Sequence, residues 1–530
     1  VSASEVPCTY LRNIIARALT VEEIEDIIEK YGIAAQRAKR AGVDAVEVHA
    51  AHGSTLIANF LSPLTNKRTD SYGGTLENRA RLAIEVLQRI KNKVGRAYPV
   101  IFRVSGDEFV PGGLTLDDTK KIAKMLEENG VDALHITAGN IAYEESYYRT
   151  YPPMAMPRAC NVYLAEAIKK VVSVPVIAVG RINDPVLAEN ILRNGQADLI
   201  AMGRALIADP ELPNKAYEGR LEDIRKCIGC FQDCGQPASN RTRLRCAVNA
   251  ECGKEIEYKL TRADVRKKVL IIGGGPAGME AARVAALRGH NVYLYEAGEK
   301  LGGQLLIASK VPGKEEINNL IEYLTTQIGK LGVNVRLGKE ATAEIIYDIQ
   351  PDVVVVATGA TPLIPPIRGV NLPHVLTAWQ VLGWRNSQAK TGDNVVVAGG
   401  GSVGCETAEY LAEQGKRVTI IEMLDEIAED MPYSSKIILK KKLSECQVNV
   451  ILGHELKEIT ENSVVTVNKK GECEIIECDT VVLALGSLPN SSVISAFKHI
   501  FPKTYAIGDC LKPRRLLEAI HDGYRVAFSL

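Results

Sequence analysis

The sequence predicts an α/β protein in which a (β/α)8 TIM barrel that lacks its N-terminal strands precedes two nested Rossmann-like domains. Three observations support this fold class. Short β-rich runs alternate with amphipathic helical stretches over residues 1–220, and four cysteines are clustered in the stretch that follows. A glycine-rich strand–turn–helix unit then occurs twice, at Gly273 and again at Gly399, 126 residues later.

Length and composition limit the number of domains and the kinds of partner to expect. A chain of 530 residues should hold two to four domains at roughly 150 residues per domain. Lys+Arg and Asp+Glu each number 64, so the net charge is +0 and neither nucleic acid nor an anionic membrane is an expected partner. No apolar run reaches the roughly 18 residues needed to cross a bilayer, and the N-terminus lacks a signal-peptide pattern. Twelve cysteines in so long a chain indicate a reduced compartment, so we expect a cytoplasmic protein.

The first domain is expected over residues 1–220, because apolar strands separated by helices indicate a parallel sheet with both faces covered. The even spacing and the polar residues at strand ends favour a barrel, with an open five-stranded sheet as the alternative. A barrel has eight strand–helix units and only five are found, so the chain is expected to begin inside the barrel. The five runs are 44–49, 99–105, 132–137, 174–180 and 197–203.

Polar residues at the ends of these strands are candidates for chemistry, because barrel enzymes place their active sites there. His49 and His52 follow the first run and could both donate to one carbonyl oxygen; two ordinary loop histidines are the alternative. Arg103 lies inside a strand, where an unpaired guanidinium is costly, so it needs a buried carboxylate or a bound cofactor. The last two runs end in glycine–arginine pairs, at the usual phosphate site of a barrel: Gly180-Arg181 and Gly203-Arg204. Together these features indicate a phosphorylated cofactor.

A cysteine-rich linker is expected over residues 221–262, with the spacing C-x2-C-x3-C-x11-C and no histidine among the four. Thiolates are soft, anionic ligands that suit zinc or an iron–sulfur cluster. Zinc sites usually contain two CxxC pairs and this stretch has one, which favours a 4Fe–4S cluster over zinc and over a chance group of buried thiols. The other eight cysteines, Cys8 among them, are interpreted as packing residues. The predicted ligands are Cys227, Cys230, Cys234 and Cys246.

Two copies of a strand, a G-x-G-x-x-G turn, a helix and a second strand ending in glutamate follow the linker. The glycines allow a tight turn, bring a pyrophosphate to the helix N-terminus and let the helix pack on the strand. Each glutamate is placed to accept hydrogen bonds from a ribose diol, and Glu422 would repel a 2′-phosphate, so NADH is favoured over NADPH. The first copy contains Gly273, Gly275, Gly278 and Glu296, and the second contains Gly399, Gly401, Gly404 and Glu422.

Related strands close each copy, one near Gly359 and one near Gly486, and Gly508-Asp509 lies near the end of the chain. This order resembles the two-dinucleotide flavoprotein disulfide reductases, in which the second fold is inserted into the first. The resemblance implies that residues 263–385 and 487–530 bind FAD and that residues 386–486 bind NAD(H). The redox CxxC of that group is absent from the sequence LGGQL at 301–305, so electrons must leave the FAD by another route. The further FAD-binding residues implied are Gly303, Gln304, Gly359, Gly508 and Asp509.

The stretch 46–82, with VEVHAAHG and FLSPLTNKRTDSYGGTLENRARL, resembles the Old Yellow Enzyme barrel. With the stretches 174–189 and 197–216 and the cysteine spacing, the whole chain is similar to the clostridial enoate reductase and 2,4-dienoyl-CoA reductase group, which includes bile-acid-inducible flavin oxidoreductases. The resemblance implies FMN in the barrel, a 4Fe–4S cluster in the linker, and FAD and NADH in the nested folds. It also assigns Arg103 to the flavin ring, the two glycine–arginine pairs to the FMN phosphate, and the pair His49 and His52 to the substrate carbonyl.

One departure concerns the tyrosine that this family usually has just after the histidine pair, where it protonates the carbon next to the carbonyl. Counting back from Phe60 places Thr55 in that position. A tyrosine phenol has a pKa near 10 and an aliphatic hydroxyl is a far weaker acid, so Thr55 is expected to position a water rather than to donate directly. Four tyrosines after the third run are a candidate source of another acid, although a packed or lid-like loop is the favoured interpretation: Tyr143, Tyr147, Tyr148 and Tyr151.

The resemblance therefore implies an NADH-dependent ene-reductase, in which electrons pass from NADH to FAD, to the cluster, to FMN and to a double bond conjugated to a carbonyl. An amine dehydrogenase of the same layout is the first alternative, although such enzymes need no pyridine nucleotide and the second glycine turn is intact. An inactive, truncated scaffold is the second alternative. Enoates, steroids, flavonoids, linear tetrapyrroles and acyl-CoA esters all carry the conjugated system, so the sequence leaves the substrate open, and it leaves a homo-oligomeric state open as well.

Overall fold

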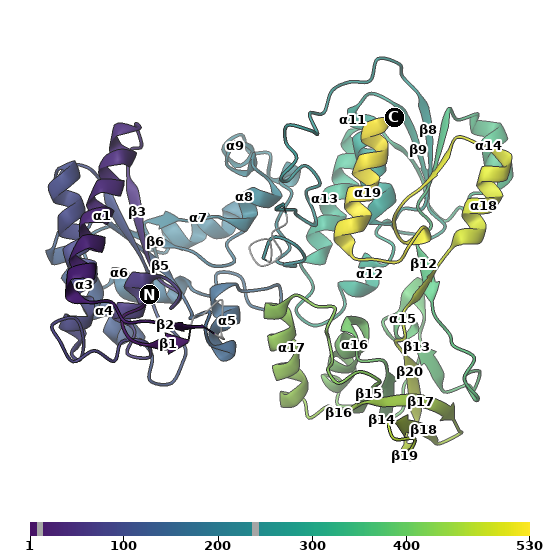
Figure 1. Ribbon diagram of the computed structural model, residues 1–530. Coiled ribbons are helices and arrows are strands. Elements are labelled where there is room, and N and C mark those ends of the chain that lie inside the picture. The colour runs from purple at the N-terminus through teal and green to yellow at the C-terminus, as the bar shows by residue number, and fades with distance from the viewer. Residues whose placement is uncertain (8–13, 236–242) are drawn as a thin grey trace. The chain divides into compact units, whose positions relative to one another are not determined.

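The structure is a computed structural model that describes residues 1–7, 14–235 and 243–530 (Figure 1). Cys8 lies outside these ranges. The described residues form two compact units, residues 1–203 and residues 204–530. Within the described ranges, no helix is both long enough and apolar enough to cross a membrane.

A parallel sheet with the strand order β3-β4-β5-β6-β7 forms the centre of the first unit. These are the five strands that the sequence predicts, in chain order and with helices between them. Their bounds are β3 (Val46–Ala50), β4 (Val100–Ser105), β5 (Ala133–Thr137), β6 (Val176–Ala178) and β7 (Leu199–Ile200). A short antiparallel pair precedes them, formed by β1 (Val6–Pro7) and β2 (Ile15–Ala16).

Several helices of the first unit begin at an N-cap residue whose side chain accepts a hydrogen bond from the start of the helix. Thr20 caps α1 in a capping box with Glu23, and Thr115 caps α4 in a capping box with Asp118, so backbone N–H groups that the helix leaves unpaired are satisfied. The helices are α1 (Val21–Arg40), α2 (Leu56–Leu61), α3 (Leu76–Val94), α4 (Leu116–Glu128), α5 (Glu144–Thr150), α6 (Val162–Lys169) and α7 (Pro185–Arg193).

The two faces of this sheet differ in chemistry. Val48, Phe102 and Leu134 lie in one hydrophobic core with residues of α1, α3, α4 and α6. Because successive strand residues point to opposite faces, the residues beside them point away from these helices. Those residues include Glu47, His49, Arg103 and His135, which are described below as part of the candidate site.

The second unit contains a five-stranded parallel sheet with the order β10-β9-β8-β11-β22. Its strands are β8 (Lys268–Ile272), β9 (Asn291–Tyr295), β10 (Asn334–Arg336), β11 (Val353–Val356) and β22 (Thr504–Ala506). Figure 1 shows α11 (Pro276–Leu287) beside α19 (Leu516–Ser529), the last helix of the chain. The sheet therefore joins strands that are distant in sequence, because residues 357–503 lie between β11 and β22 in the chain.

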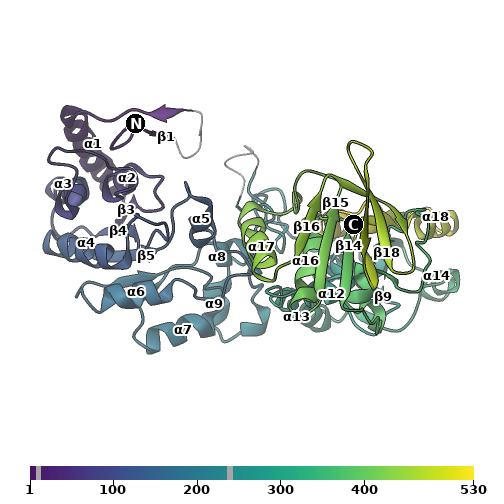
Figure 2. The ribbon, with the colours of Figure 1, turned by 90° about the horizontal axis from the view of Figure 1, so that it is seen from below.

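The inserted part contains a second sheet with the order β13-β20-β14-β15-β16. Its strands are β13 (Val375–Thr377), β14 (Asn394–Ala398), β15 (Arg417–Glu422), β16 (Asn449–Leu452) and β20 (Thr480–Leu483). Figure 2 shows β14, β15 and β16 running side by side, with α16 (Ser402–Ala412) next to them. The insertion was expected from residue 386, and the sheet also includes the earlier strand β13 because β13 pairs with β20.

Smaller elements complete the second unit. An antiparallel sheet of β17 (His454–Ile459), β18 (Ser463–Asn468) and β19 (Cys473–Glu477) follows β16, and β12 (Ala360–Pro362) pairs with β21 (Ser487–Pro489) where the chain enters and leaves the insertion. The remaining helices are α8 (Arg204–Ala208), α9 (Leu212–Tyr217), η1 (Leu221–Asp223), α12 (Leu305–Ala308), α13 (Ile317–Lys330), α14 (Ala343–Ile349), α15 (Ala378–Val381), η2 (Trp384–Asn386), α17 (Tyr433–Glu445), α18 (Ser491–Ile500) and η3 (Gly508–Cys510).

Candidate functional site

A row of three cationic or titratable residues crosses the first sheet. His49 on β3 pairs in register with Arg103 on β4, and Arg103 pairs with His135 on β5, so the three side chains leave the same face. Glu47 lies two residues before His49 on that face, and its Oε2 is 2.8 Å from Nδ1 of His135. The sequence prediction missed Glu47 and His135, although the alternation in VEVH and LHI placed both on the face of His49.

Arg103 fits a flavin as its partner. Its Nε is buried and finds no hydrogen-bond acceptor among the described residues, and the nearby carboxylate of Glu47 already contacts His135. Burial lowers the pKa of Arg103, and negative charge on Glu47 and Tyr151 opposes that shift. An unsatisfied buried N–H is costly, so this position calls for an acceptor, and the ring oxygens and nitrogens of a flavin supply such acceptors.

His52 lies just beyond the end of β3 in a strained backbone conformation, with φ at 69°, and strain of this kind is concentrated at functional sites. Its backbone N–H donates to Oγ of Ser105 at 3.0 Å, and its Nε2 is 2.9 Å from Oγ1 of Thr137. The rings of His49 and His52 meet edge to face, with centroids 5.3 Å apart. The predicted pair is therefore brought together.

Both imidazoles of this pair are neutral at neutral pH. Burial, followed by the positive charge of Arg103, lowers the pKa of His52 well below its usual value and lowers that of His49 as well. A neutral imidazole has one N–H donor and one acceptor nitrogen. The pair can therefore donate hydrogen bonds to an oxygen that gains negative charge. Because the imidazoles are neutral, they are weak acids and poor proton donors.

Thr55 has a structural role as a helix cap. It is the N-cap of α2, where its Oγ1 accepts from the backbone N–H of Ala58 at 3.4 Å and donates to the carbonyl of Ala51 at 3.4 Å. Threonine is a favoured residue at this position because it satisfies a free N–H at the start of a helix. The residue type at this position is thus explained by helix capping.

The glycine–arginine pairs have different surroundings. Gly180 has φ at 125°, and a Cβ there would lie 2.8 Å from Nδ2 of Asn161, so the position requires glycine. Arg181 is buried, and its Nε and Nη2 donate to the carbonyls of Met156 and Met154 at 3.1 and 3.2 Å. The other pair spans the boundary of the two units, since Gly203 ends the first and Arg204 begins the second. The role of these pairs at a phosphate stays a prediction.

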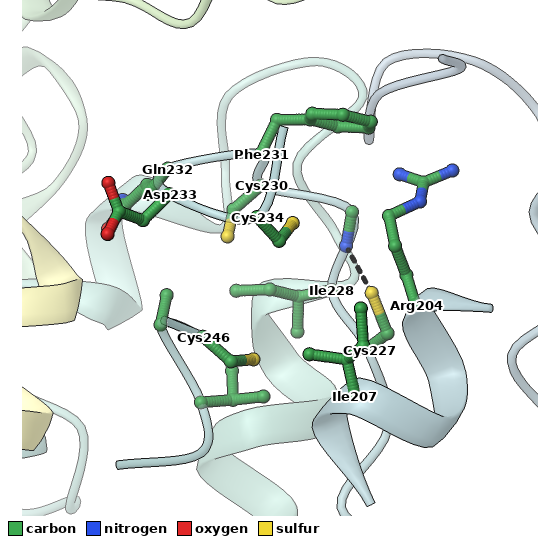
Figure 3. A pocket seen from close by; sticks show the side chains of 13 residues that line it. Arg204, Ile207, Cys227, Ile228, Cys230, Phe231, Gln232, Asp233, Cys234 and Cys246 are labelled. Atoms are coloured by element: carbon green, nitrogen blue, oxygen red, sulfur yellow. Dashed lines mark hydrogen bonds between the residues drawn. The ribbon is translucent and has the colours of Figure 1, made fainter. Parts of the chain in front are cut away.

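Four predicted ligands line one pocket in the second unit (Figure 3). The pocket encloses about 330 Å³ of empty space, open solvent included. Its wall also contains Phe231, whose ring lies 4.4 Å from the guanidinium carbon of Arg204, and the backbone N–H of Gly229, which donates to Sγ of Cys227 at 3.4 Å. The four cysteines are Cys227, Cys230, Cys234 and Cys246.

The donor set of this pocket consists of four cysteine thiols, which as thiolates are the soft ligands that zinc and iron–sulfur clusters take. In the part of the chain that the structure describes, no three His, Cys, Asp or Glu side chains gather closely enough to hold a metal ion as they stand. Burial raises the pKa of the Cys230, Cys234 and Cys246 thiols, to about 12 for Cys234, so binding of a metal group by these thiols must release protons. The choice of a 4Fe–4S cluster over zinc stays a prediction from the cysteine spacing.

Hydrogen bonds join this cysteine segment to α19. The backbone N–H of Leu517 donates to Oε1 of Gln232 at 2.9 Å, and Nε2 of His521 lies 2.9 Å from the carbonyl oxygen of Cys246. Helix α19 follows Gly508-Asp509 in the chain. Residues predicted to hold the cluster are therefore bonded to the helix that follows a predicted FAD contact.

Both glycine turns have the same steric construction. A Cβ on Gly278 would lie 1.9 Å from the carbonyl oxygen of Gly273, and a Cβ on Gly404 would lie 1.9 Å from that of Gly399. The middle glycine of each turn has more room, since a Cβ would meet no atom closer than 4.0 Å on Gly275 and would lie 3.8 Å from Oδ1 of Asp430 on Gly401. The helix that follows each turn has no side-chain cap from its N-cap glycine. This cradle fits a pyrophosphate at a helix N-terminus.

Glu296 and Glu422 are held in the same way, 126 residues apart. One carboxylate oxygen accepts from the backbone N–H of the second turn residue at 2.6 Å, which is Gly274 for Glu296 and Gly400 for Glu422. The other oxygen accepts from the N–H two residues beyond the glutamate, at 2.6 and 2.8 Å. Each acid therefore braces its own glycine turn, and its role at a ribose stays a prediction.

The two folds differ at the helix that follows the turn. In the inserted fold, the exposed carboxylate of Asp430 accepts from the backbone N–H and the hydroxyl of Ser402 at 2.8 and 2.6 Å. In the first fold the equivalent position, 126 residues earlier, is Gln304, whose Nε2 donates to Asp509 at 3.1 Å. Burial raises the pKa of Asp509. The predicted FAD contacts Gln304 and Asp509 thus meet, although they lie 205 residues apart.

Comparisons with known proteins match both parts of the chain. Residues 2–223 match the NADH:flavin oxidoreductase / NADH oxidase family, and residues 267–523 match the pyridine nucleotide-disulphide oxidoreductase family. The chain is 46% identical to an NADH oxidase of Thermoanaerobacter brockii and 37% identical to a cinnamate reductase of Clostridium sporogenes, covering 100% of this chain and 81% of each relative. A solved structure of 2-naphthoyl-CoA reductase is 36% identical with a TM-score of 0.95, over 100% of this chain and 80% of that one. These matches confirm the predicted fold class.

Proposed function

Because this chain belongs to the Old Yellow Enzyme-type NADH:flavin oxidoreductases, the group that includes the enoate reductases, we propose that it reduces a carbon–carbon double bond conjugated to a carbonyl. The chain is a flavin oxidoreductase, with an FMN-type barrel domain and a domain of the FAD- and NAD(H)-binding type. NADH is proposed as the electron donor, and a small conjugated enone or enoate as the acceptor.

The neutral pair His49 and His52, beside the orphaned Nε of Arg103, is the observation that carries this proposal. Reduction of a conjugated double bond puts negative charge on the carbonyl oxygen. Fixed N–H donors aimed at an oxygen that becomes charged are among the largest contributions an enzyme makes to rate. Arg103 would hold the flavin ring beside these donors, so the carbonyl and the electron source would share one side of the sheet.

Each cofactor has residues that would hold it. When bound, FMN would supply the hydride to the substrate, FAD would take electrons from NADH, and a cluster would carry single electrons between them. The chain's own part is to bind and orient: the glycine turns receive the pyrophosphates, Glu296 and Glu422 receive the riboses, and the four cysteines hold the cluster. The bonds from Gln232 and His521 support a route from the FAD fold to the cysteines.

Anaerobic oxidation of NADH by the complete protein tests this function. The acceptors would be an enoate, a cinnamate, a 3-oxo-Δ4 steroid, a flavonoid, a linear tetrapyrrole and a 2-enoyl thioester. We expect at least one of them to be consumed in step with NADH and to yield a product that lacks the conjugated double bond. NADH oxidation with dioxygen alone, or reduction of the flavins by an amine, would contradict the proposal.

Metal analysis gives the first prediction. Protein purified without oxygen is expected to contain about four iron and four acid-labile sulfide per chain, because four cysteines in this spacing and pocket suit a 4Fe–4S cluster. Cys246→Ser should lower the iron content. Cys252→Ser changes a buried cysteine nearby that is not one of the four, so it is the matched control and should retain iron. Stoichiometric zinc without iron would remove the proposed electron-transfer role.

Nucleotide preference gives the second prediction. Combining Glu422→Ala with Met423→Arg removes the ribose acceptor and adds a cation at an exposed position. A hydrogen bond to a charged group contributes about 1.5–3 kcal/mol, so the KM for NADH should rise on the order of tenfold or more and the preference should move toward NADPH. Glu296→Ala removes the matching brace in the first fold and should affect FAD content instead. Steady-state rates with NADH and with NADPH test this prediction. An unchanged ratio of the two rates would contradict the assignment of Glu422.

A further inference from the structure

The loops after β3 and β5 are joined through their backbones. His52 and Asn140 form an isolated parallel bridge, in which the N–H of Ile141 donates to the carbonyl of His52 at 3.0 Å. Gly53 packs so closely that a Cβ there would lie 2.2 Å from Nδ2 of Asn140. The loop that carries α5 is therefore held against the loop that carries His52.

The buried carboxylate of Glu108 stabilises the same junction by hydrogen bonds. Oε1 of Glu108 accepts from Nδ2 of Asn140 at 2.9 Å, and its Oε2 accepts from Oγ of Ser62 at 2.7 Å. Ser146, in the first turns of α5, donates to the carbonyl of Glu108 and accepts from the N–H of Asn140 at 2.8 Å. Glu108, Asn140 and Ser146 are buried, so α5 is anchored at its start by a network that also contacts the His52 loop.

Tyr151, at the C-cap of α5, is brought to the candidate active site by this anchoring. Its ring meets that of His52 edge to face, with centroids 6.4 Å apart and planes at 74°. Its oxygen is also near enough for a negative charge on it to act on the guanidinium of Arg103. Tyr151 is 36% exposed, so solvent reaches this residue.

Other groups near the pair are poor sources of a proton for carbon. The hydroxyl of Thr55 is directed to the carbonyl of Ala51 as part of the α2 cap, and an aliphatic hydroxyl is a far weaker acid than a phenol. The imidazoles of His49 and His52 are neutral. Glu47 contacts His135, and the pKa of Glu47 is lowered: burial would raise it, but the bond from His135 and the nearby positive charges outweigh burial.

We propose that Tyr151 is the catalytic acid that protonates the α-carbon of the substrate. This inference rests on the proposed function and adds to it the residue that completes the reaction. The chemistry requires an acid close to the group that holds the carbonyl oxygen, because the α-carbon is bonded directly to the carbonyl carbon. Tyr151 is the phenol whose ring contacts His52.

The proton from Tyr151 completes the reduction of the double bond. With a flavin bound to supply a hydride to the β-carbon, the electron pair of the double bond would move to give an enolate, whose oxygen His49 and His52 would hold. The enolate carbon–carbon pair then forms the new α-C–H bond with the phenol proton of Tyr151. Water returns a proton to the phenolate. The net change is consumption of one NADH, one proton and one conjugated double bond.

Tyr151→Phe separates this role from a structural one when two acceptors are compared. A conjugated enone needs a proton on carbon, whereas a benzoquinone is reduced with protons on oxygen only. Stopped-flow reoxidation of the reduced flavins should slow by about a hundredfold or more with the enone, since general acid catalysis contributes roughly 10²–10⁴ in rate, and should be unchanged with the quinone. In D₂O, the solvent isotope effect on enone reduction should also change, because another donor must protonate the carbon.

Tyr147→Phe is the matched control, since its ring is 5.6 Å from that of Tyr151 in the same helix, and Thr55→Ala tests the other hydroxyl. Both should retain the wild-type ratio of enone to quinone rates. Equal slowing with both acceptors in Tyr151→Phe, no slowing at all, or an enone-selective loss in Tyr147→Phe or Thr55→Ala would overturn the proposal. A wild type that reduces the quinone but no conjugated carbonyl would overturn the proposed function, and the role of Tyr151 with it.

Discussion

Replacing both His49 and His52 with alanine is expected to slow flavin reoxidation by an enone by a hundredfold or more, while NADH still reduces FAD at the wild-type rate. Loss of one fixed donor to a developing oxyanion typically costs about 3 kcal/mol, or roughly 10²–10³ in rate. The histidines lie in the first unit and the nucleotide turns in the second, so the two half-reactions should separate. Stopped-flow absorbance measures both on the same sample.

The single variants control for folding in this experiment. His52 is buried and contacts Thr137, so its removal leaves a polar group inside the protein. His49 is more exposed, so His49→Ala should fold normally and still lower the rate with the enone. Wild-type reoxidation in the double variant would mean that the pair does not hold the carbonyl, and the oxyanion donors would have to be sought elsewhere on this face of the sheet.

Gly404→Ala is expected to slow the reduction of FAD by NADH, on the order of a hundredfold or more. Its Cβ would lie 1.9 Å from the carbonyl oxygen of Gly399, and because both atoms belong to the chain near the turn, relief requires the turn itself to move. Misplacement by about 1 Å can cost 10²-fold in rate. FAD content should be unchanged, and dithionite should still support enone reduction.

Two further glycine variants make this result specific. Gly278→Ala places the same clash in the first fold, where it should empty the protein of FAD and retain FMN. Gly329→Ala changes an exposed glycine of α13 around which a Cβ would meet no atom within 4 Å, so activity should be retained and the helix slightly stabilised. Normal NADH kinetics in Gly404→Ala would contradict the assignment of the inserted fold to the nucleotide.

Features that the sequence predicted correctly depend on local patterns. The five strands of the first unit and both glycine turns are present because apolar runs, glycine spacing and a terminal glutamate all act over fewer than about 30 residues. The identity of the partner of each polar side chain depends on topology instead. Glu47 and His135 meet because β4 lies between their strands, and no local pattern encodes that contact.

Thr55 illustrates a role that the sequence pattern alone does not establish. Counting from Phe60 placed it in the position of a catalytic tyrosine, whereas its contacts are those of a helix cap. Tyr151 lies almost a hundred residues away in sequence and reaches His52 through the Asn140 junction. The sequence could name the tyrosines of that loop as candidates, but it is the edge-to-face contact with His52 in the structure that distinguishes Tyr151.

The contrast between Ser402 with Asp430 and its counterpart in the first fold bears on how long each nucleotide stays. FAD must remain through many turnovers, whereas NAD⁺ must leave after each one. A nucleotide phosphate that approaches the N–H of Ser402 has to displace a carboxylate already bound there, and that carboxylate returns when the product departs. At the first fold the residue in the matching position is turned to Asp509 instead. With FAD in the first fold and NAD(H) in the inserted fold, as proposed, this difference would favour retention of the nucleotide in the first copy and its exchange in the second.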